Sequence, residues 1–330
     1  ICGEEGWDDI AEFAEDREEW LTELLGLRHG TPCGDTFRRV WSVIDPEEFS
    51  RCFLSWTASL VPAMDGKQVA IDGKTVRGSA SADSPLHLVG AWVADHNVFL
   101  GQVATDEKSN EICAIPALMK LLNLRGAIVT IDAMGCQKRI AQQVVEQKGD
   151  YLFALKDNHP TLHAEVLSVF SGADRMPNGL DFAEEHDKGH GRLETRRVWA
   201  SREVGWLTQG ESWPNLFQLV LVERERTRGD STSLERATYL TSCKLPAEGL
   251  ARVIRGHWGI ENKVHWMLDV TYSEDRARIA DRRAAQNFAL LRRLSMNLLK
   301  AISVPRKPDM SVRRKRKRAA ARPLFLREVI

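Results

Sequence analysis

The order of hydrophobic patterns between residues 67 and 155 constrains the fold more than any other feature of the chain. Three short β-rich runs separated by polar turns predict a three-stranded antiparallel meander. A helical pattern, an apolar strand, a second helix and another strand follow. The uninterrupted apolar run "GAIVTIDA" is typical of a strand buried in a parallel sheet. The order predicts a mixed α/β sheet in which the first and fourth strands are neighbours.

The flanking segments have other patterns. Residues 7–60 predict helices with an apolar stripe and an acidic outer face. Residues 180–242 return to β structure, and a helix is expected to start behind Pro246. We therefore assign five segments. They are an N-terminal helical unit (1–65), a core in two parts (66–165 and 246–300), a β-rich insertion (166–245) and a basic C-terminal tail (301–330).

The net charge of the chain does not indicate a type of partner, because 46 basic and 46 acidic residues cancel. The distribution is uneven: residues 1–50 hold 14 acidic and 4 basic side chains, and residues 300–330 hold 11 basic and 2 acidic ones. Such asymmetry predicts an anionic partner for one end of the molecule. Six scattered cysteines without a CxxC pair indicate reduced thiols in the cytoplasm. We expect no membrane helix, and we expect that natural residues precede the first one here.

Three acidic residues could form one site although they lie far apart in the chain. Asp72 ("VAIDGK") is on the first predicted strand, and Asp132 ("VTIDAM") ends the fourth. Each follows an isoleucine that would point to the opposite face, because neighbouring residues on a strand alternate. Since the two strands are adjacent in such a sheet, the carboxylates can meet. Glu261, in "GHWGIENKVHWMLDV", stands among apolar residues and needs a partner for its charge.

Three acids held together repel one another unless cations lie between them. Carboxylate oxygens with open positions suit Mg²⁺, and two ions about 4 Å apart can clamp the reacting oxygens of a phosphodiester displacement. We expect two Mg²⁺ ions, with Mn²⁺ as a substitute, at Asp72, Asp132 and Glu261. A simpler interpretation of either aspartate alone is a turn residue, since short motifs match by chance. Agreement of all three positions with the strand order favours the metal site.

Two histidines allow a different metal. His257 and His265 flank Glu261 at intervals of four residues on one helical stripe, which would also suit zinc. We favour the alternative in which both histidines pack or hydrogen-bond inside the helix interface.

Several basic residues could contact DNA phosphate. Lys74 and Arg77 closely follow Asp72, and solvated loop charges are an equal alternative for them. The hairpin segment "HDKGHGRLETRR" adds His190 and Arg192, and a solvated hairpin tip is again as good an interpretation. The run "RRKRKR" is most simply a solvated segment, although its charge density would bind any polyanion with a salt-dependent affinity.

With these residues in place, the chain resembles the DDE-type insertion-sequence transposases, most closely the ISAs-type group that includes H-repeat-associated proteins. The resemblance covers essentially the whole chain. It is carried by "GWDDIAEFAEDREEWL", "VAIDGKTVRGS", "EKSNEI", "IVTIDAMGCQK", "DYLFALKDN", "HGRLETR", "HWGIENKVHW" with "LDV" and "EDRAR", and "LRRLSMNLL". It implies an RNase H-like α/β core, whose strand order is the one predicted above. It also implies that Asp72, Asp132 and Glu261 form the catalytic DDE triad.

The chain departs from the wider superfamily around the glutamate. That superfamily often has a Tyr, an Arg and a Lys there, and this chain has Ile254, His257 and Leu268 at the matching positions. We therefore expect Arg255, His257 and Lys263 to contact phosphate instead.

The resemblance implies a cytoplasmic transposase that works without a covalent enzyme intermediate. Metal-activated water would free a 3′-hydroxyl at the end of the element, and that hydroxyl would attack target DNA in the same pocket. The implied partners are double-stranded DNA, as terminal inverted repeats and as target, and a second copy of the chain. One alternative is a catalytically inactive remnant that only binds DNA. The other is a zinc hydrolase that uses His257, Glu261 and His265.

Overall fold

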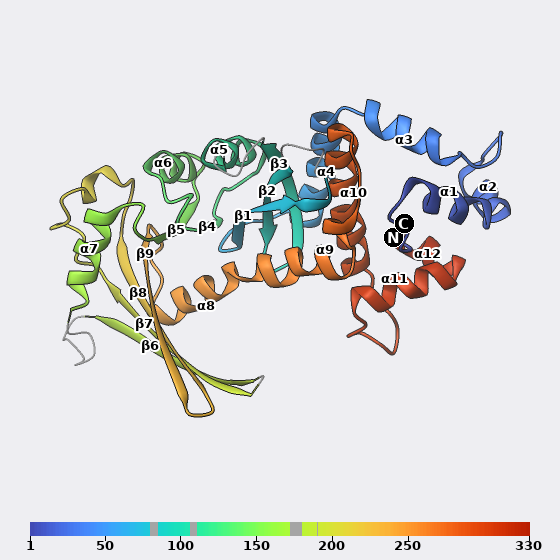
Figure 1. The fold of residues 1–330 in the computed structure, drawn as a ribbon. Helices are drawn as coiled ribbons and strands as arrows, with labels where there is room; N and C mark the ends of the chain where they lie inside the picture. Colours follow the sequence, from blue (N-terminus) through green and yellow to red (C-terminus); the bar gives the residue numbers. More distant parts are fainter. Residues whose placement is uncertain (80–84, 106–110, 172–179, 190) are drawn as a thin grey trace.

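The computed structural model describes residues 1–79, 85–105, 111–171, 180–189 and 191–330. His190, one of the predicted phosphate contacts, lies outside the described residues. Across the described residues the strands form one mixed nine-stranded sheet in the order β3-β2-β1-β4-β5-β9-β8-β7-β6. Helices lie on both faces of the sheet (Figure 1).

The centre of the sheet is the predicted α/β core. Strands β1 (Gln68–Val76), β2 (Leu86–Val93) and β3 (Val98–Thr105) form the antiparallel meander. Strand β4 (Ile128–Ile131) then pairs in parallel with β1, and β5 (Asp150–Leu155) pairs in parallel with β4. Helices α5 (Glu111–Leu121) and α6 (Lys138–Glu146) are the intervening crossovers. The RNase H-like strand order is confirmed.

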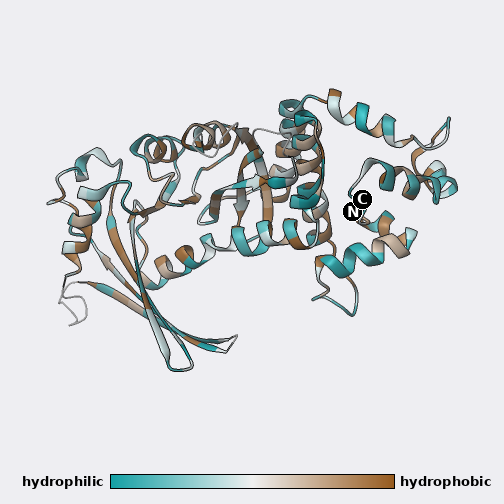
Figure 2. Ribbon diagram, viewed as in Figure 1, coloured by the Kyte–Doolittle hydropathy of each residue, from teal (hydrophilic) through white to brown (hydrophobic). Residues whose placement is uncertain are grey.

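The β-rich segment continues the core sheet. Its elements are α7 (Pro160–Val169), β6 (Asp181–Gly189), β7 (Arg192–Ser201), β8 (Gln218–Arg228) and β9 (Ser231–Thr241). Strand β9 pairs antiparallel with β5, and β8, β7 and β6 follow outward. Residues 198–201 of β7, 218–223 of β8 and 238–241 of β9 are buried, whereas β6 has no buried residue. The other halves of these strands are polar and extend away from the core (Figures 1 and 2). The hydropathy pattern predicted these strands, but it did not predict that β9 pairs with β5 of the core sheet.

The last acidic helix of the prediction is interrupted. Helix α8 (Ala247–His257) begins behind Pro246, as predicted, and α9 (Trp266–Val270) continues its course. Between them Glu261–His265 forms a π-helical turn, and such turns occur frequently at functional sites. Helix α10 (Arg282–Ala301) follows, and the Asp281 side chain caps it by accepting from the Ala284 amide. These helices cover the sheet face opposite α5 and α6 (Figure 1).

The N-terminal unit is helical, as predicted. It comprises α1 (Trp7–Glu15), α2 (Glu18–Leu25), α3 (Gly34–Val43) and α4 (Pro46–Leu60). The helical conformation is interrupted at Asp16 and Arg17, so the single helix that was predicted first is two helices. None of the described helices combines the length and the apolar composition that crossing a bilayer requires.

The prediction of a solvated basic tail was wrong. The tail contains α11 (Val312–Ala321) and α12 (Pro323–Val329), and Lys315 and Arg316 are buried. Lys315 Nζ donates to two carbonyl oxygens at the end of α10, 2.7 and 2.8 Å away. A lysine is favourable there because the last carbonyls of a helix have no partner within it.

Part of the charge asymmetry is used inside the molecule. Glu5 of the acidic end binds Arg316 of the tail and Arg292 of α10, each at 3.1 Å. Both termini lie in this region, where α1, α11 and α12 come together (Figure 1). The expectation that one charged end awaits an anionic partner therefore holds only for basic residues that remain exposed, such as Arg313 and Arg314.

Candidate active site

The sheet register brings two of the predicted acids to neighbouring positions. Ile71 on β1 is paired with Ile131 on β4 in parallel register, so Asp72 and Asp132 follow side by side. Asp72 is partly buried, while Asp132 begins the loop after β4. The Asp132 carboxylate accepts from the Met134 and Gly135 amides, at 3.1 and 3.3 Å, and these contacts fix its direction.

Glu261 joins them from the π-helical turn. The side chain is exposed, and two of its apolar neighbours in sequence, Ile260 and Leu268, are fully buried. Gly259 lets this segment approach the sheet, because a Cβ at that position would lie 2.6 Å from the Trp92 ring. Of the apolar neighbours, Trp266 alone lines the acidic pocket together with Glu261.

All three acids line one pocket of about 500 Å³. The pocket residues are Asp72, Gly73, Glu111, Asp132, Glu261, Asn262, His265 and Trp266. The predicted convergence on a common space is thus observed. Among the described residues, however, no group of three or more His, Cys, Asp or Glu side chains is close enough to form a metal-binding set as it stands.

The electrostatics of the pocket are those of uncompensated like charges. Burial and the charges of Asp132, Glu261 and Glu111 raise the pKa of Asp72 to about 7. Loss of hydration, followed by the charge of Glu111, raises the pKa of Asp132. Loss of hydration, followed by the charge of Asp132, raises the pKa of Glu261. The carboxylates are held at an electrostatic cost that a cation would relieve.

Glu111 is an acid of this pocket that the sequence reasoning missed. It begins α5, is buried, and lies 2.6 Å from His87 Nε2, while His87 Nδ1 lies 2.9 Å from Thr75 Oγ1. Gly73 leaves room for it, since a Cβ there would overlap the Glu111 carboxylate. The available signal was the second glutamate of "EKSNEI", which is Glu111 and is the first residue of the helix that follows the third strand.

The two histidines do not complete a zinc site. His257 Nδ1 lies 3.0 Å from Thr130 Oγ1 on β4, whereas His265 Nδ1 lies 3.5 Å from Asp72 Oδ2 on β1. The π-helical turn between them breaks the regular stripe that the spacing suggested. Burial lowers the pKa of His257 to about 4, and burial with the charges of Arg293 and Lys74 lowers that of His265 to about 3. Both therefore remain neutral, as our favoured interpretation of packed histidines requires.

Two predicted phosphate contacts lie in different surroundings. Lys74 is 8% exposed, and its ammonium lies 2.7 Å from Asp269, 3.2 Å from Asp275 and 3.5 Å from Glu274. Such enclosure leaves no free position for a phosphate oxygen. Arg77 is 82% exposed and 3.8 Å from Asp275, so its guanidinium remains accessible.

Three of the remaining predicted phosphate contacts line a larger groove, whereas His257 does not line it and instead contacts Thr130. This groove, of about 1030 Å³, lies between strands β6–β9 and helix α8, and Arg192, Arg255 and Lys263 line it. Glu261 and Asn262 line both the groove and the acidic pocket, so the two spaces meet there. The groove cations are partly neutralised by groove acids, as in the pair Arg192–Glu194 at 3.5 Å.

The chemistry of the pocket fits divalent cations. Its donors are carboxylate oxygens, the hard ligands that Mg²⁺ prefers, and their pKa values are raised by burial and then by the charges of neighbouring acids, both of which a bound cation would offset. Mg²⁺ is commonly held by one or two carboxylates, with water and substrate phosphates completing its shell. An open pocket lined by Asp72, Asp132 and Glu261, with Glu111 beside them, fits that mode.

Comparison with known proteins identifies relatives over the whole chain. A family described as "Transposase DDE domain" matches residues 63–298, and one described as "DDE_Tnp_1-associated" matches residues 1–57. The "Putative transposase YncI" of Escherichia coli O157:H7 is 36% identical over 344 aligned positions, which cover all of this chain and 86% of that protein. The "H repeat-associated putative transposase YhhI" of Escherichia coli K12 is 34% identical over all of this chain and 89% of its own length. An "Uncharacterized protein in dhlA 3'region" of Xanthobacter autotrophicus is 46% identical over 73% of this chain and 83% of its own length.

Proposed function

Because the chain belongs to the transposase DDE domain family, we propose that it cleaves and transfers DNA strands at the ends of an insertion sequence. The observation that carries the proposal is the pocket shared by Asp72, Asp132 and Glu261. They come from two neighbouring strands and a distant helix, and they are held together against their mutual repulsion. A fold without a function for this cluster would gain stability by separating the charges.

Each acid has a definable part in such a reaction. Asp72 and Asp132 lie at neighbouring sheet positions and would hold divalent cations together, and Glu261 would complete the site from the opposite side. Bound Mg²⁺ would supply charge neutralisation and activation of the attacking oxygen. The chain itself would contribute positioning of the scissile phosphodiester and a fixed electrostatic environment, which supply most of the catalysis in phosphoryl transfer.

The groove beside α8 is the proposed path of the DNA. It leads to the acidic pocket at Glu261 and Asn262, and its cations are placed to contact phosphates. Arg255 is 54% exposed, and its guanidinium is paired with Asp187 at 2.9 Å and Glu185 at 3.5 Å. DNA phosphates would compete with these two acids for the arginine.

This competition predicts opposite effects of two substitutions. Arg255→Ala should weaken binding to duplex DNA and reduce the slope of log affinity against log salt by about one, because one phosphate contact is lost. Asp187→Ala should strengthen binding, because it removes one of the two carboxylates that compete with phosphate for the guanidinium. Fluorescence anisotropy over a salt series measures both effects, with Arg139→Ala on α6 as the control on the opposite face. Equal salt slopes for Arg255→Ala, Arg139→Ala and the wild type would place the DNA elsewhere.

The function itself is tested by strand cleavage. The purified chain is incubated with Mg²⁺ or Mn²⁺ and a duplex taken from the genomic segment that flanks its coding sequence. It should nick this duplex at defined positions and leave 3′-hydroxyl ends. The products should be absent with EDTA and from a scrambled duplex. DNA binding without nicking under any of these conditions would instead support the inactive, DNA-binding remnant. Because transposition must bring two DNA ends together, we further propose that two copies of the chain form a homodimer on DNA. We also propose that the protein acts in the cytoplasm.

A further inference from the structure

Two polar contacts connect strand β1 with the helical segment that carries Glu261. Asp72 and Lys74 are two residues apart on β1 and therefore point to the same face of the sheet. His265 and Asp269 are four residues apart and lie on one side of their helix. His265 Nδ1 is 3.5 Å from Asp72 Oδ2, and Lys74 Nζ is 2.7 Å from Asp269 Oδ1. The strand and the helix are thus joined at two successive positions.

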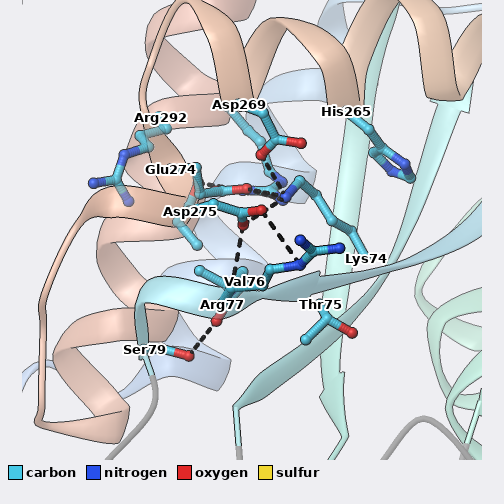
Figure 3. Close-up of polar contacts among 12 residues, drawn as sticks. Lys74, Thr75, Val76, Arg77, Ser79, His265, Asp269, Glu274, Asp275 and Arg292 are labelled. Atoms are coloured by element: carbon cyan, nitrogen blue, oxygen red, sulfur yellow. Dashed lines mark hydrogen bonds and ion pairs between the residues drawn. The ribbon is translucent and has the colours of Figure 1, made fainter.

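The Lys74 contact belongs to a buried ionic cluster (Figure 3). Besides Asp269, the ammonium lies close to Asp275 and Glu274, and it donates a hydrogen bond to Asp275 at 3.2 Å. Glu274 is fully buried and also binds Arg293 of α10 at 2.6 Å. Asp275 also accepts from the backbone amide of Arg77. The lysine is therefore fixed from several elements, and only Asp269 belongs to the helix that follows Glu261.

A second anchor lies on the other side of Glu261. His257, four residues before the glutamate, contacts Thr130 Oγ1 on β4 at 3.0 Å. Thr130 is two residues before Asp132, as Lys74 is two residues after Asp72. The segment around Glu261 is thus tied to each of the two strands that bear the aspartates. A shift of the helix along the sheet would break one of these ties.

From this geometry we propose that Lys74 and Asp269 are positioning residues, which fix the helix of Glu261 on β1 and so set where Glu261 stands relative to Asp72. The inference rests on the proposed function for its catalytic consequence. It replaces the prediction that Lys74 contacts phosphate. Neither residue lines the acidic pocket, so they act through the acids that do.

The matched variants are Asp269→Ala and Asp275→Ala. Both remove a carboxylate next to the same ammonium, 2.7 and 3.2 Å away, and both leave Lys74 two carboxylate partners. They differ in whether the lost group is on the helix of Glu261. Asp269→Ala should lower kcat for cleavage by about 10- to 100-fold, because small displacements of reacting groups are costly, with KM for DNA unchanged. Asp275→Ala should stay within about threefold of the wild type. Asp269→Asn should recover part of the rate, because its amide oxygen keeps a polar contact with the Lys74 ammonium although the charge is lost.

Hydrogen exchange separates this inference from the proposed function. In Asp269→Ala the amides of residues 259–268 should exchange at least about tenfold faster than in Asp275→Ala, because the helix loses its tie to β1. If the wild type does not cleave DNA but this difference appears, the proposed function fails and the anchor stands. If the two alanine variants match in both kcat and exchange, the anchor is refuted, even in an active enzyme. The anchor is also refuted if Asp269→Ala raises the KM for DNA and leaves kcat unchanged.

Discussion

Asp132→Asn should reduce metal-dependent strand cleavage by about 10²- to 10³-fold or more, while the protein stays folded and binds DNA. The substitution removes a negative charge from the acidic pocket, and loss of one preorganised electrostatic group commonly has an effect of this size. The fold should be preserved, because an asparagine Oδ1 can still accept from the Met134 and Gly135 amides.

The measurement is the rate of nicking at saturating DNA, beside the unfolding midpoint and the DNA affinity. Asp65→Asn is the matched control, since Asp65 is exposed in the turn before β1, at the end of the parallel pair β1–β4 opposite to Asp132. The control should cleave at the wild-type rate. Wild-type cleavage by Asp132→Asn would remove this residue from the site, and with it the triad.

Asp72→Asn should stabilise the metal-free protein at pH 8 by about 2 to 4 kcal/mol. The pKa of Asp72 is about 7 in the fold against an ordinary value of 3.8, and each pKa unit corresponds to about 1.36 kcal/mol. At pH 3 and below the carboxyl is protonated in both states and contributes almost nothing. Between about pH 3.8 and 7 the unfolded chain loses this proton while the folded chain keeps it, so the free energy of unfolding falls as pH rises. The variant lacks this loss.

Urea unfolding in EDTA at pH 3 and at pH 8 measures the effect. The free energy of unfolding of the variant should exceed that of the wild type at pH 8, and the difference should vanish at pH 3. Millimolar Mg²⁺ should stabilise the wild type at pH 8 and leave Asp72→Asn nearly unchanged, because a ligand that binds only the folded state raises its stability. A variant less stable than the wild type at pH 8 would show that the Asp72 charge is compensated within the protein.

The candidate site was predictable in part. Asp72 and Asp132 could be paired from sequence, because each follows an isoleucine on a strand and the strand order makes β1 and β4 neighbours. Glu261 was assigned to the same site from its charge among apolar residues and then from the resemblance, because no local pattern connects a late helix to that sheet edge. Glu111 was missed because its role depends on how α5 begins relative to β1, which no periodicity reports.

The basic residues were harder to assign than the acids. Lys74 and Arg77 look alike in sequence, yet one is enclosed by three carboxylates and the other is 82% exposed. Lys315 and Arg316 lie in a run of six basic residues, and both are buried against chain ends and helix carbonyls. A cation's task depends on which acids and carbonyls surround it, and those come from distant segments.

The sequence by itself determined the order of strands and helices in the core, the helical N-terminal unit and the β-rich segment, because local hydropathy and turn residues act within a few positions. Only the tertiary structure decided that β9 extends the core sheet from β5, that a π-helical turn presents Glu261, and that Lys74 holds the helix behind it. These features arise from pairing and burial between segments tens to hundreds of residues apart. Their free energy depends on which groups meet in space, and local pattern does not encode that choice.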